Sequence, residues 1–360
     1  MKNAMTLGKV AGIKIYIHWT FSFLIAWVVL ANRHAGLSWL STAWMVGFTL
    51  TVFCCVLLHE LGHALAAKRY NIITDSITLL PIGGLAQLES IPEEPKQELL
   101  IALAGPAVNF VIALALLPFI SIHHVVNPEH LSNLTPSNFP FFLAMVNIWL
   151  GVFNLLPAFP MDGGRVLRAI ISFFTSHSKA TQIATAIGQV FGAIFFFAGF
   201  LYSPTLIVIG VFIFISGQHE SNVARITDFL HGYYVRDAAI NEIPTIENST
   251  SVREAARILL TTQNKTFVVT DRGKPVGSIT REDIARAMME IDPNETIDHV
   301  KNSAVAYVAE TTPLDEAWKI MQKDKCHLVL VGKNEEATGI LEDENIAELM
   351  LFNPSGTRRK

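Results

Sequence analysis

The stretch TVFCCVLLHELGHALAAKRY, residues 51–70, places three titratable side chains within an apolar segment. His59 and His63 are four residues apart, so on a helix their imidazoles share one face and can bind one metal ion. Glu60 follows about 100° round that helix, within reach of a water beside the ion. The plainer alternative is the end of a membrane span, where polar residues meet lipid headgroups. Because ionisable groups in spans are costly and usually functional, the pattern favours a metal site.

The rest of the composition indicates a membrane protein. Of the 360 residues, 51% are hydrophobic and only 16% charged, whereas soluble domains carry about 25% charged residues. Spanning a bilayer takes about 20 apolar residues. We predict six transmembrane helices, one in each of 17–31, 39–58, 99–122 and 139–161, and two in 183–217 on either side of Ser203 and Pro204.

The distribution of positive charge predicts the orientation. With six spans, one side of the membrane receives nine Lys or Arg residues near the span ends, and the other receives only Arg33. Cytoplasmic loops carry the excess of Lys and Arg. We therefore expect a multi-pass protein of the cell membrane with both termini in the cytoplasm.

Two histidines leave a zinc site incomplete, because a catalytic site needs a third protein ligand and an open position. Asp162 follows the fourth predicted span and should lie at the membrane depth of His59. Pro157 and Pro160 break the helix before it, and irregular backbone at that depth is tolerated only inside protein or a water-filled cavity. The alternative for Asp162 is an ordinary helix cap.

Four segments resemble those of the site-2 proteases, a family of intramembrane zinc metalloproteases. They are HELGH (59–63), PIGGLAQLE (81–89), AGPAVNF (104–110) and NLLPAFPMDGG (154–164). The resemblance implies one zinc ion bound by His59, His63 and Asp162, with Glu60 as the catalytic base. It also places Asn154 at the site, where its amide would stabilise the oxyanion. The alternative for Asn154 is a hydrogen-bonding role in helix packing. For Asn109, helix packing is the expected role, and a role at the site is the alternative.

A transmembrane substrate must unwind before its peptide bond becomes accessible. Residues 76–89 have the composition of an extended strand or hairpin, and Gly83 and Gly84 allow a bend. We expect the edge of this segment to pair with the unwound substrate by strand addition.

The C-terminal third is a soluble α/β region with an internal duplication. Its helix–strand–turn–strand–helix pattern returns 62 residues later without a gap, with Val252 matching Leu314 and Gly277 matching Gly339. This pair resembles cystathionine-β-synthase (CBS) domains. We predict a protease domain at 1–222, a linker at 223–232, and CBS domains at 233–291 and 292–360.

The CBS resemblance implies a regulatory module with one adenine-nucleotide site at Thr280 and Asp283. The equivalent residues of the second repeat are Glu342 and Asn345, which do not match the ribose-binding pattern. The alternative is a dimerisation pair without ligand, through which the chain would form a homodimer.

Three functions remain to be separated. The first is cleavage of transmembrane protein substrates within the lipid bilayer, regulated by the CBS pair. The second is a CBS-regulated metal-ion transporter or channel, and the third is an inactive protease scaffold. A transporter would place ionisable groups at mid-membrane and often repeat its spans, which favours the protease. No nucleic-acid partner is expected.

Overall fold

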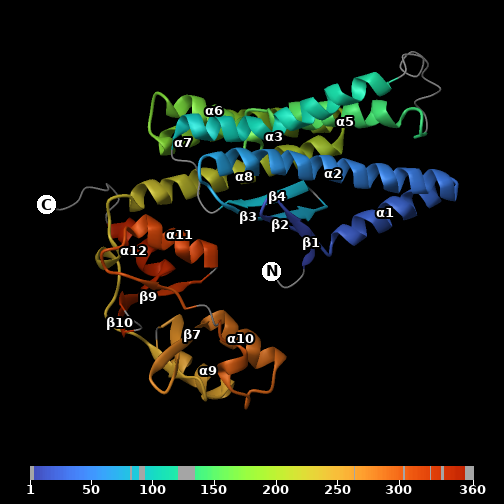
Figure 1. Cartoon of the computed structure of the whole chain (residues 1–360). Coiled ribbons are helices and arrows are strands. Elements are labelled where there is room, and N and C mark those ends of the chain that lie inside the picture. Colours follow the sequence, from blue (N-terminus) through green and yellow to red (C-terminus); the bar gives the residue numbers. More distant parts are fainter. Residues whose placement is uncertain are drawn as a thin grey trace. The chain divides into compact units, whose positions relative to one another are not determined.

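The computed structural model describes residues 4–81, 83–88, 94–120, 134–262, 264–302, 305–324, 326–333 and 336–352. It divides into two compact units, Met1–Ala224 and Arg225–Lys360. Figure 1 shows the elements of both along the chain. The helix α8 begins in the first unit, and its last residues belong to the second.

The first unit is built from apolar helices. In the described part of the chain, four helices are long and apolar enough to cross a membrane: α2 (Trp39–Arg69), α3 (Pro95–Leu116, continued by the 3-10 turn η1, Leu117–Phe119), α7 (His177–Leu201) and α8 (Pro204–Leu230). The helices α1 (Phe21–His34) and α5 (Phe139–Asn154) are apolar but shorter. Six spans therefore stay a prediction. The predicted break falls where expected, since α8 begins at Pro204.

The helix α6 (Asp162–Ser172) is short and follows a tightly folded loop. A Cβ atom on Gly163 would overlap the backbone carbonyl oxygens of Leu155 and Leu156. Only a residue without a side chain allows the chain to double back this closely before α6. The turn leads directly into α6, which packs against α3.

A four-stranded sheet packs beside α2 (Figure 1). Its order is β1 (Ala4–Val10), β2 (Ile13–His18), β3 (Thr74–Leu80) and β4 (Gly83–Leu88). The strands β3 and β4 form the hairpin predicted at 76–89, and β2 pairs parallel to β3. The prediction of a helix from residue 17 was wrong at its start, because residues up to His18 pair as strand β2 and α1 begins at Phe21.

The sheet is joined to α2 by a small apolar core. Ile13 and Ile77 from the sheet pack against Leu61 and Ala64 of α2, and all four are buried. These α2 residues flank His63, so the same turn of helix carries the histidine and anchors the sheet. The outer strand β4 pairs with β3 alone among the described strands, so its other backbone edge is unpaired.

The helix α3 occupies the middle of the first unit. It packs against α2, α5 and α6, while α7 packs against α6 (Figure 1). The helices α7 and α8 approach closely at Gly192 and Gly210, where a Cβ on Gly210 would lie 2.5 Å from the carbonyl oxygen of Gly192. Small residues allow such close backbone approach between membrane helices.

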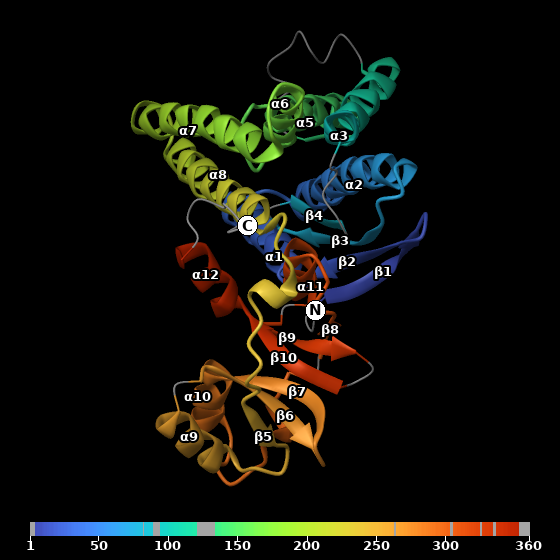
Figure 2. The same cartoon turned by 90° about the vertical axis from the view of Figure 1, so that its left-hand side faces the viewer.

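The second unit contains two similar three-stranded sheets (Figure 2). The first repeat comprises β5 (Thr245–Glu247), α9 (Val252–Thr261), β6 (Thr266–Asp271), β7 (Lys274–Thr280) and α10 (Arg281–Glu290), with the 3-10 turns η3 (Val235–Asp237) and η4 (Ile297–His299) outside these elements. The second comprises β8 (Tyr307–Val308), α11 (Leu314–Asp324), β9 (Leu328–Lys333), β10 (Glu336–Glu342) and α12 (Asp343–Phe352).

The duplicated positions occupy equivalent places in these two sheets. Val252 and Leu314 each begin a helix and are fully buried. Gly277 and Gly339 each lie where a Cβ would overlap a passing backbone carbonyl oxygen. The internal repeat in the sequence is thus a repeat in the fold. The domain boundaries predicted above stay a prediction.

Candidate metal centre

The two histidines of α2 converge on one point. His59 and His63 are 6% and 7% exposed, and their Nε2 atoms lie 3.1 Å apart. Their separation by four residues places both rings on the face of α2 that meets α3.

Each histidine is oriented by a hydrogen bond at its other nitrogen. Nδ1 of His63 lies 2.7 Å from the carbonyl oxygen of Ile101. A carbonyl only accepts, so Nδ1 carries the proton and the lone pair is on Nε2. Nδ1 of His59 lies 2.5 Å from Oδ1 of Asn109. The second ring therefore also directs an unprotonated Nε2 into the cluster, as metal-ligating histidines do.

The direction of the Asn109 contact is set by a further residue. Nδ2 of Asn109 donates to Oδ1 of Asn147 over 3.1 Å, and Nδ2 of Asn147 donates to the carbonyl oxygen of Leu143 over 2.8 Å. Both asparagines are completely buried. The chain of donors leaves Oδ1 of Asn109 facing His59 as an acceptor, so α3 and α5 together hold that ring.

Asp162 completes the cluster from the first turn of α6. It is 8% exposed, and its Oδ2 lies 3.1 Å from Nε2 of both His59 and His63. The three side chains predicted as metal ligands are thus brought together by α2 and α6.

The donor set fits zinc in both chemistry and size. Zinc binds imidazole nitrogen and carboxylate oxygen at about 2.0–2.2 Å, which places neighbouring ligand atoms of a tetrahedron about 3.3 Å apart. The three separations here are each 3.1 Å. Three protein ligands leave the fourth position of a tetrahedral site for water or substrate.

Glu60 lies beside this cluster, against the strand β4. A Cβ on Gly84 would lie 2.5 Å from Cγ of Glu60 and 3.0 Å from its Oε1. The backbone of β4 therefore passes directly over the glutamate. This close approach explains a glycine at position 84 and brings the unpaired strand edge next to the predicted base.

Gly105 of α3 has a similar role on the other side. A Cβ at this position would overlap the Nε2 atoms of both His59 and His63. The backbone of α3 is thus in contact with the two rings. No side chain of any size can occupy position 105 without moving the histidines.

The structure differs from the sequence analysis at the asparagines. Packing was the expected role for Asn109, and its side chain does join α3 to α5 through Asn147. It also contacts His59, which was the alternative. Asn147 was not identified at all. Asn154, predicted to stabilise the oxyanion, donates its amide to the carbonyl oxygen of Leu150 on its own helix over 3.0 Å. A role for it at the site stays a prediction.

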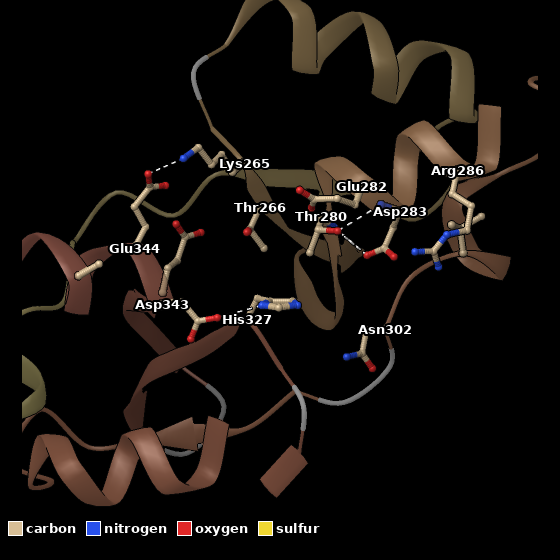
Figure 3. A pocket seen from close by; sticks show the side chains of 13 residues that line it. Lys265, Thr266, Thr280, Glu282, Asp283, Arg286, Asn302, His327, Asp343 and Glu344 are labelled. Atoms are coloured by element: carbon tan, nitrogen blue, oxygen red, sulfur yellow. Dashed lines mark hydrogen bonds and ion pairs between the residues drawn. The ribbon is translucent and has the colours of Figure 1, made fainter. Parts of the chain in front are cut away.

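The second unit contains a cavity of about 940 Å³ between the two repeats (Figure 3). Thr280 and Asp283 line it from the first repeat, and Glu342 lines it from the second. Oδ2 of Asp283 accepts hydrogen bonds from the backbone nitrogen and Oγ1 of Thr280, over 3.1 and 2.7 Å. Thr280 and Asp283 thus cap α10, and Oδ1 of Asp283 has no part in this cap. In the second repeat Asn345 makes the equivalent backbone contact, to Glu342.

The cavity is acidic. Glu282, Asp283, Glu342, Asp343 and Glu344 line it, against Lys265, Arg286 and His327. Lys265 pairs with Glu344 over 2.5 Å. Burial, together with the neighbouring Glu344 and Asp343, raises the pKa of Glu342 to about 7.

A buried set of two histidines and an aspartate with an adjacent glutamate defines the site of a metal-dependent hydrolase. The family model for peptidase family M50 matches residues 47–128 and 116–199, and the CBS domain model matches 235–290 and 297–351. Zinc metalloprotease MJ0392 of Methanocaldococcus jannaschii is 32% identical over 356 residues, 97% of this chain and 98% of the relative. The chain therefore belongs to the site-2 proteases, peptidase family M50, and is a membrane-bound zinc metalloprotease with a CBS pair.

Two solved structures are also similar. A site-2 protease from the same archaeon shares 34% identity over 61% of this chain and 95% of that chain, with a TM-score of 0.44. The CBS domain pair of protein MJ0100, solved with 5′-methylthioadenosine and S-adenosyl-L-methionine, shares 28% identity over 34% of this chain and 98% of that chain, with a TM-score of 0.31.

The close contact of α3 with the two histidines predicts that a methyl group added at Gly105 will weaken zinc binding. Gly105→Ala should weaken zinc binding by about tenfold or more, because the added Cβ displaces the rings that outer contacts hold in place. Gly47→Ala is the matched control, since a Cβ there meets open space within another apolar helix. Zinc content of both purified variants checks this. Equal zinc content in the two would contradict the packing described here.

Proposed function

We propose that this protease hydrolyses peptide bonds in or near the transmembrane segments of membrane proteins. The observation that carries the proposal is the buried cluster of His59, His63 and Asp162 with Glu60 beside it, in a unit built of apolar helices. The excess of Lys and Arg at one set of span ends supports a cell-membrane location with both termini cytoplasmic.

Zinc bound by His59, His63 and Asp162 would polarise the scissile carbonyl and lower the pKa of a water toward 7. Glu60 accepts the proton of the attacking water and returns it to the leaving amine. Its position under β4 excludes bulk solvent from one side of the carboxylate. Asn154 would serve the oxyanion only after its amide releases the carbonyl oxygen of Leu150.

The role of Glu60 predicts separation of zinc binding from hydrolysis. Glu60→Gln should keep zinc at the wild-type level, because Glu60 is not one of the three ligands. Cleavage of a transmembrane substrate should fall by a factor of about 10²–10⁴, the usual contribution of a general base. Metal analysis and a cleavage assay in detergent measure the two quantities, and the inactive variant also allows bound substrates to be captured. Cleavage at the normal rate would exclude Glu60 as the base.

The unpaired edge of β4 is proposed as the substrate-binding element. It lies beside Glu60 through Gly84 and continues through Leu85 and Gln87, whose backbones pair with Thr78 and Ser76 of β3 in register. An unwound segment can add to such an edge by main-chain hydrogen bonds. This holds the substrate extended beside the metal cluster.

Proline substitution tests this edge. Leu85→Pro with Gln87→Pro removes two backbone donors, and two hydrogen bonds at about 1 kcal/mol each correspond to roughly a thirtyfold loss of cleavage. The matched control is Leu7→Pro, which lies at the bulge of β1 on the opposite edge of the same sheet. Both variants should keep zinc. Strand addition at β4 would be contradicted if the double proline variant cleaved substrate at the normal rate. It would also be contradicted if Leu7→Pro lost as much cleavage as the double variant.

We propose further that the cavity of the CBS pair binds one adenine nucleotide and regulates proteolysis. Thr280 and Asp283 lie at its wall, and Oδ1 of Asp283 can accept from a ribose diol. A homodimer through the same pair stays a prediction. For binding to change cleavage, the nucleotide must prefer one conformation of the protein over another.

The nucleotide site predicts both a mutant and a pH effect. Asp283→Ala should weaken AMP or ATP binding about tenfold or more, while Asn345→Ala, the equivalent change in the second repeat, should not. Affinity for these anions should rise as the pH falls from 8 to 6, because Glu342 is ionised above about pH 7 and neutral below it. Glu342→Gln should remove that part of the pH dependence.

Calorimetry on the full-length protein measures these affinities. Binding that survives Asp283→Ala would place the site elsewhere. Absence of binding by any adenine nucleotide would leave the pair as a dimerisation or docking module.

A further inference from the structure

Arg168 of α6 is a buried cation outside the metal cluster. It is 3% exposed, and its Nε donates to Oε1 of Glu98 on α3 over 2.7 Å. Its second partner is Glu220 of α8, whose Oε1 accepts from the guanidinium over 2.5 Å. The guanidinium also lies over the ring of Phe159, 5.1 Å from the centroid. One side chain therefore joins three helices and the loop that leads to Asp162.

This ion pair network shares two helices with the metal site. Arg168 lies six residues after Asp162 on the same short helix, about 9 Å along its axis. Glu98 lies on α3, the helix that also carries Gly105 and Asn109 against the histidines. Arg168 and Asp162 thus share one short helix, so a shift of α6 at Arg168 would also move Asp162.

The two carboxylate partners differ in their surroundings. The side chains of Arg168 and Glu98 are each 4% exposed, whereas that of Glu220 is 31% exposed. A buried charge without a partner is costly, so the pair with Glu98 must persist. Glu220, the more exposed of the two carboxylates, is the partner that can be released. The structure shows Arg168 bound to both carboxylates, and loss of the Glu220 contact would leave it bound to Glu98 alone.

The releasable partner lies on the helix that continues into the second unit. Ten residues beyond Glu220, about 15 Å along α8, Leu230 is fully buried in the core of the second unit with Tyr233 and Val235. The helix α8 is unbroken between these two positions. The chain from the second unit to Glu220 is thus a continuous stretch of helix.

We propose that the contact between Glu220 and Arg168 couples the CBS pair to the metal centre. Arg168 is a positioning residue for Asp162, and α8 sets whether Glu220 holds it. The inference deepens the proposed regulation and rests on that function for its purpose. The coupling is measured as a change in zinc affinity, so the test needs neither a substrate nor a nucleotide.

The test is a double-mutant cycle on the full-length protein in detergent, read as the zinc dissociation constant in competition with a chelator. Glu220→Gln removes the charge that holds Arg168. Ala224→Gly with Arg225→Gly weakens α8 between Glu220 and Leu230, because glycine is a poor helix former. Gln218→Ala is the matched control, since it removes a contact of α8 with Gln189 of α7 that does not reach α6.

Both Glu220→Gln and the double glycine variant should weaken zinc binding by about tenfold. This is the lower end of the loss in metal affinity usually seen when residues that support metal ligands are changed. Because they interrupt one connection, the combined variant should also lose about tenfold, and the control should stay within twofold. A hundredfold loss in the combined variant would show independent effects and overturn the proposal. So would unchanged zinc affinity in Glu220→Gln, or a loss in the control equal to that of Glu220→Gln.

Failure of the proposed function gives a different result. A wild-type protein that binds zinc but does not cleave any transmembrane substrate would contradict the protease proposal. The zinc dissociation constants of the double-mutant cycle could still be measured and compared in that case. Near-ultraviolet circular dichroism of each variant confirms that the compared proteins are folded.

Discussion

The geometry of the metal centre depends on the hydrogen bonds that orient His59 and His63, above all the one between His59 and Asn109. Two imidazoles and a carboxylate lie in an apolar environment, where polar atoms without partners are costly. Each ring nitrogen that faces away from the cluster must therefore meet an acceptor. Asn109 and the carbonyl of Ile101 provide these from α3, and Asn147 fixes the orientation of Asn109 from α5. The same contacts that remove the cost of burial also direct both Nε2 atoms at Asp162.

Close backbone approach is the second requirement of this arrangement. Gly105 lets α3 reach the rings, Gly84 lets β4 cross Glu60, and Gly163 lets the chain turn back into α6. Each glycine leaves a space that a single methyl group would fill. The site is thus assembled where three backbones meet, and none of its side chains comes from a long loop among the described residues.

Much of the architecture could be predicted from the residues. The four-residue spacing of His59 and His63 predicted two rings on one helix face, and the apolar segment before Asp162 predicted its membrane depth. The 62-residue duplication predicted two similar halves in the second unit. The strands β1 and β2 were missed, since the apolar residues that begin the segment at Ile17 read as the start of a span. The sequence did not separate the two roles of Asn109, and it gave no sign of Asn147, because an asparagine within an apolar helix has the same pattern whether it packs or orients a ligand.

The sequence pattern could not predict which group the side chain of Asn154 contacts. Its amide donates to the carbonyl oxygen of Leu150 on its own helix, a contact that the sequence pattern does not reveal. The network around Arg168 was equally invisible, because its three charged members are 52 and 70 residues apart in sequence. Contacts of this kind follow from helix packing, which fixes distances that local sequence does not encode.

X-ray absorption spectroscopy of the zinc-loaded protein tests the central claim most directly. The account predicts one zinc per chain with two imidazole nitrogens and only light oxygen atoms completing the coordination, at about 2.0–2.2 Å. A sulfur ligand at about 2.3 Å, or a spectrum with no imidazole contribution, would contradict the assignment of His59, His63 and Asp162.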